Sequence, residues 1–187
     1  MKKYLIYFAV ISLLAFGFFG CRFYGPSDKE VFKAMEAVMR GFESSMNQET
    51  LEIDNAYANA VDAVFRNEDD SVVTNMTVFM NEGVFHVYGN CIFSDYQDAS
   101  SDYLMNGELV YNIKYRGRSN AEAGFGEMSC AAELSGGKIE TLEFSFKIDE
   151  GGRIEEFLVS ANETDIEIKK EKNLYELFKQ WSQTVPG

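Results

Sequence analysis

The chain has 187 residues, of which 30 are acidic and 17 are basic, so its formal net charge is −13. Nucleic-acid phosphates need an excess of Lys and Arg, and the charge therefore argues against nucleic acid as a partner and against electrostatic adhesion to anionic lipid. One histidine and three cysteines offer few imidazole and thiolate ligands, so we expect no metal site and no cofactor.

Residues 1–20 are typical of a secretory signal. Lys2 and Lys3 precede an uncharged stretch that runs from Tyr4 to Gly20. A short basic region followed by an apolar run and a small residue is the pattern that the export machinery recognises and cleaves. The apolar run is also at the lower limit of length for a membrane-spanning helix, so an uncleaved anchor helix stays open as the alternative.

The four residues from Phe18 to Cys21 resemble a lipobox, the motif at which a bacterial lipoprotein precursor receives a diacylglyceryl group before cleavage. Gly20 and Cys21 match the motif. Phe18 stands where Leu is usual and Phe19 where a small residue is usual, a relaxed form similar to that of spirochaetes. The resemblance implies cleavage between Gly20 and Cys21 and fatty acylation of Cys21, for example with palmitate. Two or three acyl chains attach a protein to a membrane effectively permanently, whereas one chain binds reversibly.

The remainder of the chain divides into a tether and a domain. Residues 21–28, which include Gly25 and Pro26, are expected to form a short lipidated tether, and residues 29–187 a single domain. That length can enclose a hydrophobic core. We expect an exported protein held on a bacterial membrane through Cys21, facing the periplasm or the cell surface.

Three segments show helical periodicity. In residues 28–46 apolar residues recur at steps of three and four, and Ser27 or Asp28 can cap the start. A weaker stripe runs from Ile53 to Phe65. The third stripe lies near the C-terminus and consists of Leu174, Leu177, Phe178 and Trp181. The stripes predict amphipathic helices whose apolar sides face the core.

Between residues 71 and 170 the apolar pattern changes to a period of two, most clearly where Leu142, Phe144 and Phe146 alternate with polar residues. This alternation predicts an antiparallel sheet with one dry face. Glycine-containing breaks favour hairpins and therefore a meander. About seven strands are expected, at residues 72–80, 84–94, 103–116, 127–135, 138–148, 153–161 and 164–170. The predicted fold class is α+β, a curved antiparallel meander sheet packed on amphipathic N-terminal and C-terminal helices.

Cys91 and Cys130 support two competing inferences. An even pair of cysteines in an exported domain suggests a disulfide. Both, however, fall on the dry face of their strands, and in a meander the strand at 103–116 lies between them. They would then be separated by roughly 9–10 Å, beyond the Cα separation of about 7 Å that a disulfide tolerates. We favour the meander, because it depends on several turns rather than on one pair.

No side chains stand out as a catalytic set. His86 falls on the polar face of its strand and is expected to be an ordinary surface histidine. The loop at 95–102 carries Asp95, Asp98 and Asp102; it lacks the spacing and the turn glycine of an EF-hand, so a solvated hairpin loop is expected and a calcium site is the alternative. No nucleophile, base and orienting group occur together, and we expect no enzymatic activity.

A second resemblance concerns the run at 93–98 together with the run at 103–109, Tyr-Leu-Met-Asn-Gly-Glu-Leu. The pair is similar to a strand–loop–strand signature of uncharacterised secreted bacterial proteins, and it implies no particular activity.

Two functional hypotheses follow for the envelope protein. The first is a non-enzymatic structural or protein-interaction module. The second is a carrier of an apolar ligand or lipid, because a concave half-barrel with an aromatic lining and a helical cover resembles the architecture of bacterial lipoprotein carriers. A pocket of several hundred Å³ between sheet and helices would favour the carrier, and a filled core would favour the interaction module.

Overall fold

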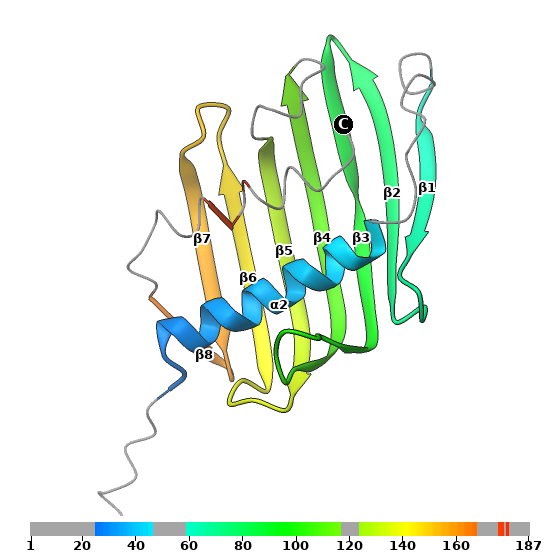
Figure 1. The fold of residues 1–187 in the computed structure, drawn as a ribbon. Coiled ribbons are helices and arrows are strands. Elements are labelled where there is room, and N and C mark those ends of the chain that lie inside the picture. Colours follow the sequence, from blue (N-terminus) through cyan, green and yellow to red (C-terminus); the bar gives the residue numbers. More distant parts are fainter. Residues whose placement is uncertain (1–24, 47–58, 117–123, 168–175, 178, 180–187) are drawn as a thin grey trace, which may run out of the picture.

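The computed structural model describes residues 25–46, 59–116, 124–167, 176, 177 and 179. They form helix α2 (Asp28–Met46) and an eight-stranded antiparallel sheet in which every strand pairs with its neighbour in sequence (Figure 1). The strands are β1 (Val61–Arg66), β2 (Val72–Asn81), β3 (Val84–Gln97), β4 (Leu104–Arg116), β5 (Phe125–Ser135), β6 (Thr141–Ile148), β7 (Ile154–Ala161) and β8 (Thr164–Asp165). The antiparallel meander predicted from the sequence is confirmed.

Helix α2 has the predicted bounds, and Ser27 caps it. The amide of Ser27 donates to Glu30 Oε2 at 2.8 Å, and the amide of Glu30 donates to Ser27 Oγ at 3.4 Å, which is a reciprocal capping box. Lys138, in the β5–β6 connection, forms an ion pair with Glu30 at 2.6 Å. The hydrogen bond from Lys138, followed by those from Ser27, lowers the pKa of Glu30 to about 2. The start of the helix is therefore held on the sheet.

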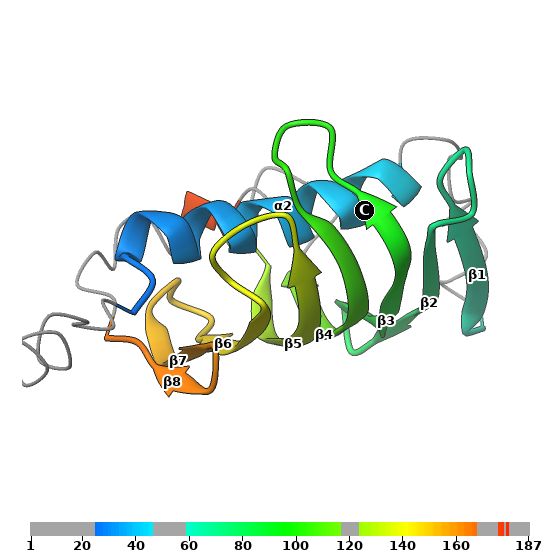
Figure 2. The same ribbon diagram turned by 90° about the horizontal axis from the view of Figure 1, so that it is seen from below.

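Helix α2 crosses the strands on one face of the sheet, starting on the side of β6–β8 and ending near β1 and β2 (Figure 2). Its apolar stripe is buried except for the partly exposed Phe32, and Phe42 packs edge-to-face on Tyr111 of β4 with ring centroids 5.5 Å apart. Burial of one such aromatic side chain stabilises the fold by about 1.5–3 kcal/mol. The face that α2 covers is called the inner face below, and the opposite one the outer face.

The helix predicted over Ile53 to Phe65 is wrong in its described part. Val61–Arg66 is strand β1, in register with β2 through the pairs Val61↔Val78 and Phe65↔Thr74. The apolar residues of this segment fit both the period of a helix and the period of a strand. Pairing with the free edge of β2 gives the backbone of the segment hydrogen-bond partners that an isolated turn of helix would lack. Residues 53–58 lie outside the described part.

The predicted packing on two terminal helices is matched by α2 only, since residues 176, 177 and 179 are all that the structure describes near the C-terminus. Leu174, Phe178 and Trp181 lie outside the described side chains. Leu177 is helical and buried in the core. The last predicted strand, 164–170, is shortened to Thr164–Asp165, and residues 168–170 lie outside the described part.

A bulge interrupts the register of β3 with β4. Phe93 pairs with Gly107 and Tyr96 pairs with Met105, so Ser94 and Asp95 together face one residue of β4. Because of the extra residue, the side chain of Tyr96 lies on the inner face, as that of Phe93 does, and their ring centroids are 6.2 Å apart. The chain beyond the bulge is thereby directed over α2 (Figure 2).

Candidate functional site

The predicted lipidation and cleavage residues, Gly20 and Cys21, lie outside the described residues. None of the helices within the described part is long and apolar enough to cross a membrane.

Cys91 and Cys130 are both buried, and neither forms a disulfide. In the register of the sheet Cys91 pairs with Leu109, and Leu109 pairs with Cys130 on its other side. Burial raises the pKa of Cys91 to about 12 and also raises that of Cys130. Both thiols are therefore protonated core residues at neutral pH, as the meander predicted.

His86 lies on the outer face, where the sequence placed it, and its ring stacks on Phe79 of β2 at 4.7 Å between centroids. Partial burial, and secondarily the charge of Lys114, lower the pKa of His86. The imidazole is thus neutral near pH 7, and its surroundings are those of a packed surface residue.

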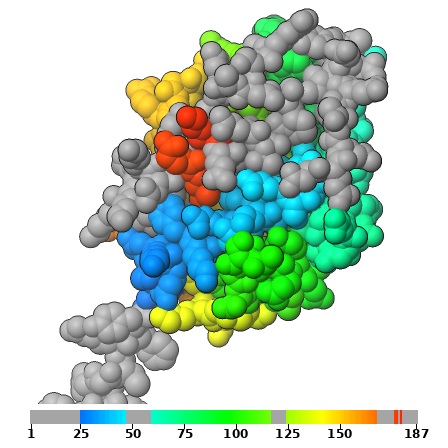
Figure 3. Space-filling view, in the orientation of Figure 1, coloured from blue at the N-terminus to red at the C-terminus, as the bar shows by residue number. Residues whose placement is uncertain are grey.

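The loop at 95–102 is not simply solvated, because Asp98 is 2% exposed. Arg40 of α2 donates from Nε to Asp98 Oδ1 at 3.0 Å and from Nη2 to Oδ2 at 2.9 Å, and Ser101 also donates to this carboxylate. Figure 3 shows the surface of this loop against that of α2. Within the described residues no group of three or more His, Cys, Asp or Glu side chains could hold a metal ion. Asp98 instead attaches the hairpin to the helix.

The outer face of the sheet carries exposed apolar side chains. All five large apolar residues that the described part exposes project from this face: Val64, Tyr88, Ile92, Val110 and Leu158. Leu158 is 60% exposed and Val110 is 46% exposed. An apolar group left in water costs free energy that burial against a partner would recover. The outer face is accordingly the candidate functional surface.

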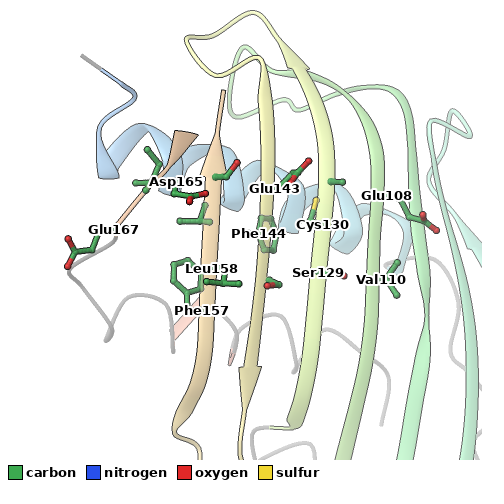
Figure 4. A pocket seen from close by; sticks show the side chains of 15 residues that line it. Glu108, Val110, Ser129, Cys130, Glu143, Phe144, Phe157, Leu158, Asp165 and Glu167 are labelled. Carbon is green, nitrogen blue, oxygen red and sulfur yellow. The ribbon is translucent and has the colours of Figure 1, made fainter. Parts of the chain in front are cut away.

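A groove of about 830 Å³ crosses the outer face from β4 to β8 (Figure 4). Its middle follows one row of paired residues across the strands, in which Val110 faces Ser129, Ser129 faces Ser145, and Ser145 faces Leu158. The small serines form the floor and the two larger apolar side chains the walls. The shape follows from side-chain size on neighbouring strands.

The next row of the groove carries carboxylates. It runs Glu108, Ala131, Glu143, Ser160 and Asp165, and Glu167 follows β8 at the same end. The described residues that line the groove include these four acids and no basic side chain. The site therefore combines an apolar middle with a negative border.

Glu108 is held in place by a chain of amides. Asn75 Nδ2 donates to Asn90 Oδ1 at 2.9 Å, and Asn90 Nδ2 donates to Glu108 Oε1 at 2.6 Å. Among the described residues, nothing contacts the second carboxylate oxygen of Glu108 through a hydrogen bond or an ion pair. The carboxylate is thus oriented on one side and open to a partner on the other.

Apart from Cys130, the residues that line this groove could not be singled out from the sequence. Two signals were available in the sequence. Small residues occupy alternate outer positions, Ser129 and Ala131 on β5 and Ser145 on β6. Apolar residues, Val110 and Leu158, stand at positions that the alternation assigns to solvent. Strand pairing was needed to show that they form one row.

Comparisons with protein-family models, curated proteins and solved structures find no match to this chain.

Proposed function

We propose that this protein is a membrane-anchored lipoprotein of the bacterial cell envelope that acts as a non-enzymatic protein-interaction module. The observation that carries the proposal is the outer face of the sheet, on which every exposed large apolar side chain of the described part is gathered. Because α2 covers the opposite face, the outer face is the one that a partner can reach.

The inner face supports an interaction module rather than a carrier. Side chains of α2 and the sheet fill the layer between them: Val38, Phe42 and Leu109 have no exposed surface and Tyr111 has 1%. A carrier of the kind considered above needs room for its ligand in this layer. The groove of about 830 Å³ lies outside this layer, on the solvent side of the sheet.

The anchor would keep the module close to its membrane. Seven residue steps separate Cys21 from the start of α2 at Asp28, and an extended chain of that length spans at most about 25 Å. The start of α2 lies on the side of β6–β8 (Figure 1), so the end of the sheet that carries Leu158 would be held near the membrane surface.

Site-specific photocrosslinking in the producing bacterium tests the proposed function. A photoreactive amino acid at position 110 or 158 is expected to give a protein adduct of discrete mass. The same amino acid at Glu36, which is exposed on α2, serves as the control and is expected to give none. Absence of adducts at 110 and 158, or identical adducts at all three positions, would contradict an interaction surface on the outer face.

A further inference from the structure

We infer that the groove across β4–β8 is the docking site for a cationic, partly apolar segment of a partner protein. The inference rests on the proposed function and specifies the chemistry of its partner.

The apolar half of the groove fits one side chain or a short run of side chains. Val110 and Leu158 are three strands apart in one row, with only Ser129 and Ser145 between them. At a strand spacing of about 4.8 Å the walls are about 14 Å apart, which leaves room for an aliphatic side chain above the two serines. Such a side chain would cover both exposed walls.

The negative charge of the groove favours a positively charged partner. Glu108, Glu143 and Asp165 occupy alternate strands of one row, so neighbouring carboxylates are about 10 Å apart. A segment in the polyproline II conformation advances about 9.3 Å in three residues. Basic residues at every third position would therefore meet successive carboxylates, with charge-assisted hydrogen bonds to each.

Among the residues that the structure describes, the surface beside the groove adds no free positive charge. Lys147 lies beyond the row of Ser129 and Ser145, on the side away from the carboxylates, and already forms an ion pair with Glu155 at 2.8 Å. In the register of the sheet it also stands between Glu127 and Glu156. A second copy of this chain, with a net charge of −13, and an anionic lipid surface are both repelled by such a face. A basic protein segment is the complementary occupant.

Binding of a synthetic probe to the purified chain with Cys21→Ser tests the inference. The probe is a fluorescein-labelled nine-residue peptide with the sequence Arg-Ser-Leu repeated three times, and a peptide with Glu in place of Arg is its control. We expect saturable binding of the arginine peptide alone, measured by fluorescence anisotropy. The affinity should fall as salt is raised, since exposed charge pairs are screened.

Two matched pairs of variants locate the binding. Glu108→Gln with Glu143→Gln should weaken the affinity about five- to tenfold, as expected for the loss of two solvent-exposed charge pairs. Glu36→Gln with Glu68→Gln, which removes two exposed acids outside the groove, should leave it unchanged. Leu158→Ser should weaken binding, whereas Val64→Ser, at a similarly exposed apolar residue on β1, should not.

The outcomes separate this inference from the proposed function. Absence of saturable binding, or equal weakening by the groove pair and the control pair, overturns the cationic partner. If spermidine competes as well as the peptide and Leu158→Ser has no effect, the groove binds small polycations and the inference of a protein segment is wrong. Crosslinked adducts at positions 110 and 158 that form equally in the Glu108→Gln, Glu143→Gln variant would retain the interaction module while contradicting its charge-based recognition.

Discussion

Cys91 on β3 and Cys130 on β5 face the same core on either side of Leu109, which separates them by the full width of β4. Two strand spacings amount to about 10 Å, and a disulfide requires Cα atoms within about 7 Å. The fold thus keeps two thiols in its interior without joining them, and the proposed export would place them in an oxidising compartment.

This arrangement predicts two free thiols in the Cys21→Ser protein. Titration with a thiol reagent after denaturation without reductant should count two. In the native protein both thiols should react slowly at pH 8, because burial keeps the reagent away from the sulfur atoms. Burial also raises the pKa of Cys91 to about 12, so this thiol stays protonated and is a poor nucleophile. An intramolecular bridge found by peptide mapping would contradict the register of the sheet.

The Arg40–Asp98 pair is predicted to stabilise the fold asymmetrically. Arg40→Met should cost about 3 kcal/mol at pH 7, because it leaves the buried carboxylate of Asp98 without its cation. Asp98→Asn should cost less, about 1–2 kcal/mol, since Arg40 is 31% exposed and can be hydrated. Urea unfolding of both variants beside the wild type measures the difference, and an equal cost for the two would argue against this asymmetry.

The same pair gives a dependence on pH. Burial raises the pKa of Asp98, but the hydrogen bonds from Arg40 and Ser101 outweigh it, so the folded-state pKa lies below the usual value. A lowered carboxyl pKa contributes stability above the unfolded value of about 3.9 and loses it as the pH falls through the folded value. The penalty of Arg40→Met should therefore be full at pH 7 and should shrink at pH 3; a constant penalty would mean that Asp98 is not the titrating group.

Gly89 is predicted to be intolerant of substitution. A Cβ at this position would lie 2.0 Å from the carbonyl oxygen of Asn75, to which the hydroxyl of Tyr111 donates at 3.0 Å. Gly89→Ala should cost several kcal/mol, on the order of 3, because backbone must shift. Tyr111→Phe, which removes the hydrogen bond alone, should cost about 1 kcal/mol. Thermal unfolding followed by circular dichroism checks both, and a well-tolerated alanine would contradict the close approach of β2 and β3.

Cys21→Ser is predicted to abolish fatty-acid labelling and to leave the precursor uncleaved at this site. The acyl chains supply the membrane affinity of the mature protein, whereas the uncleaved variant is expected to keep the apolar run from Tyr4 to Gly20. Metabolic labelling with a palmitate analogue and mass spectrometry of the mature N-terminus measure the outcome. An unlabelled wild type, or a mature chain that begins at another residue, would contradict the lipobox.

The sheet was predictable because its signals are local. Alternation within each strand and glycine-containing turns between strands placed β2 to β7 within a few residues of their positions. Strand β1 was not predictable in the same way, since Val61, Val64 and Phe65 also fit a helical stripe. The free edge of β2 decides the conformation, and that edge exists only in the assembled sheet.

The contacts between distant segments could not be predicted from the pattern. Asp98 looked like one of several acids in a polar loop, and only the bulge at Ser94 and Asp95 brings it to Arg40, 58 residues earlier in the chain. The groove was hidden for the same reason, because its floor and walls come from four strands. Alternation assigns a residue to a face, but register is needed to assign its neighbours on that face.

Helix α2 stands at the start of the described chain, before the sheet on which it packs. Each strand pairs only with its neighbour in sequence, so the sheet can grow by local hairpins, and such topologies fold without long loop closures. The helix leads the chain, yet it packs on strands from β1 to β6, among them β4 through Tyr111. Its apolar stripe therefore has no complete docking surface until β6 has been made, and the helix is expected to be among the last elements to become stable. A chain that threads through an export channel from its N-terminus would thus deliver its helix first and consolidate it last.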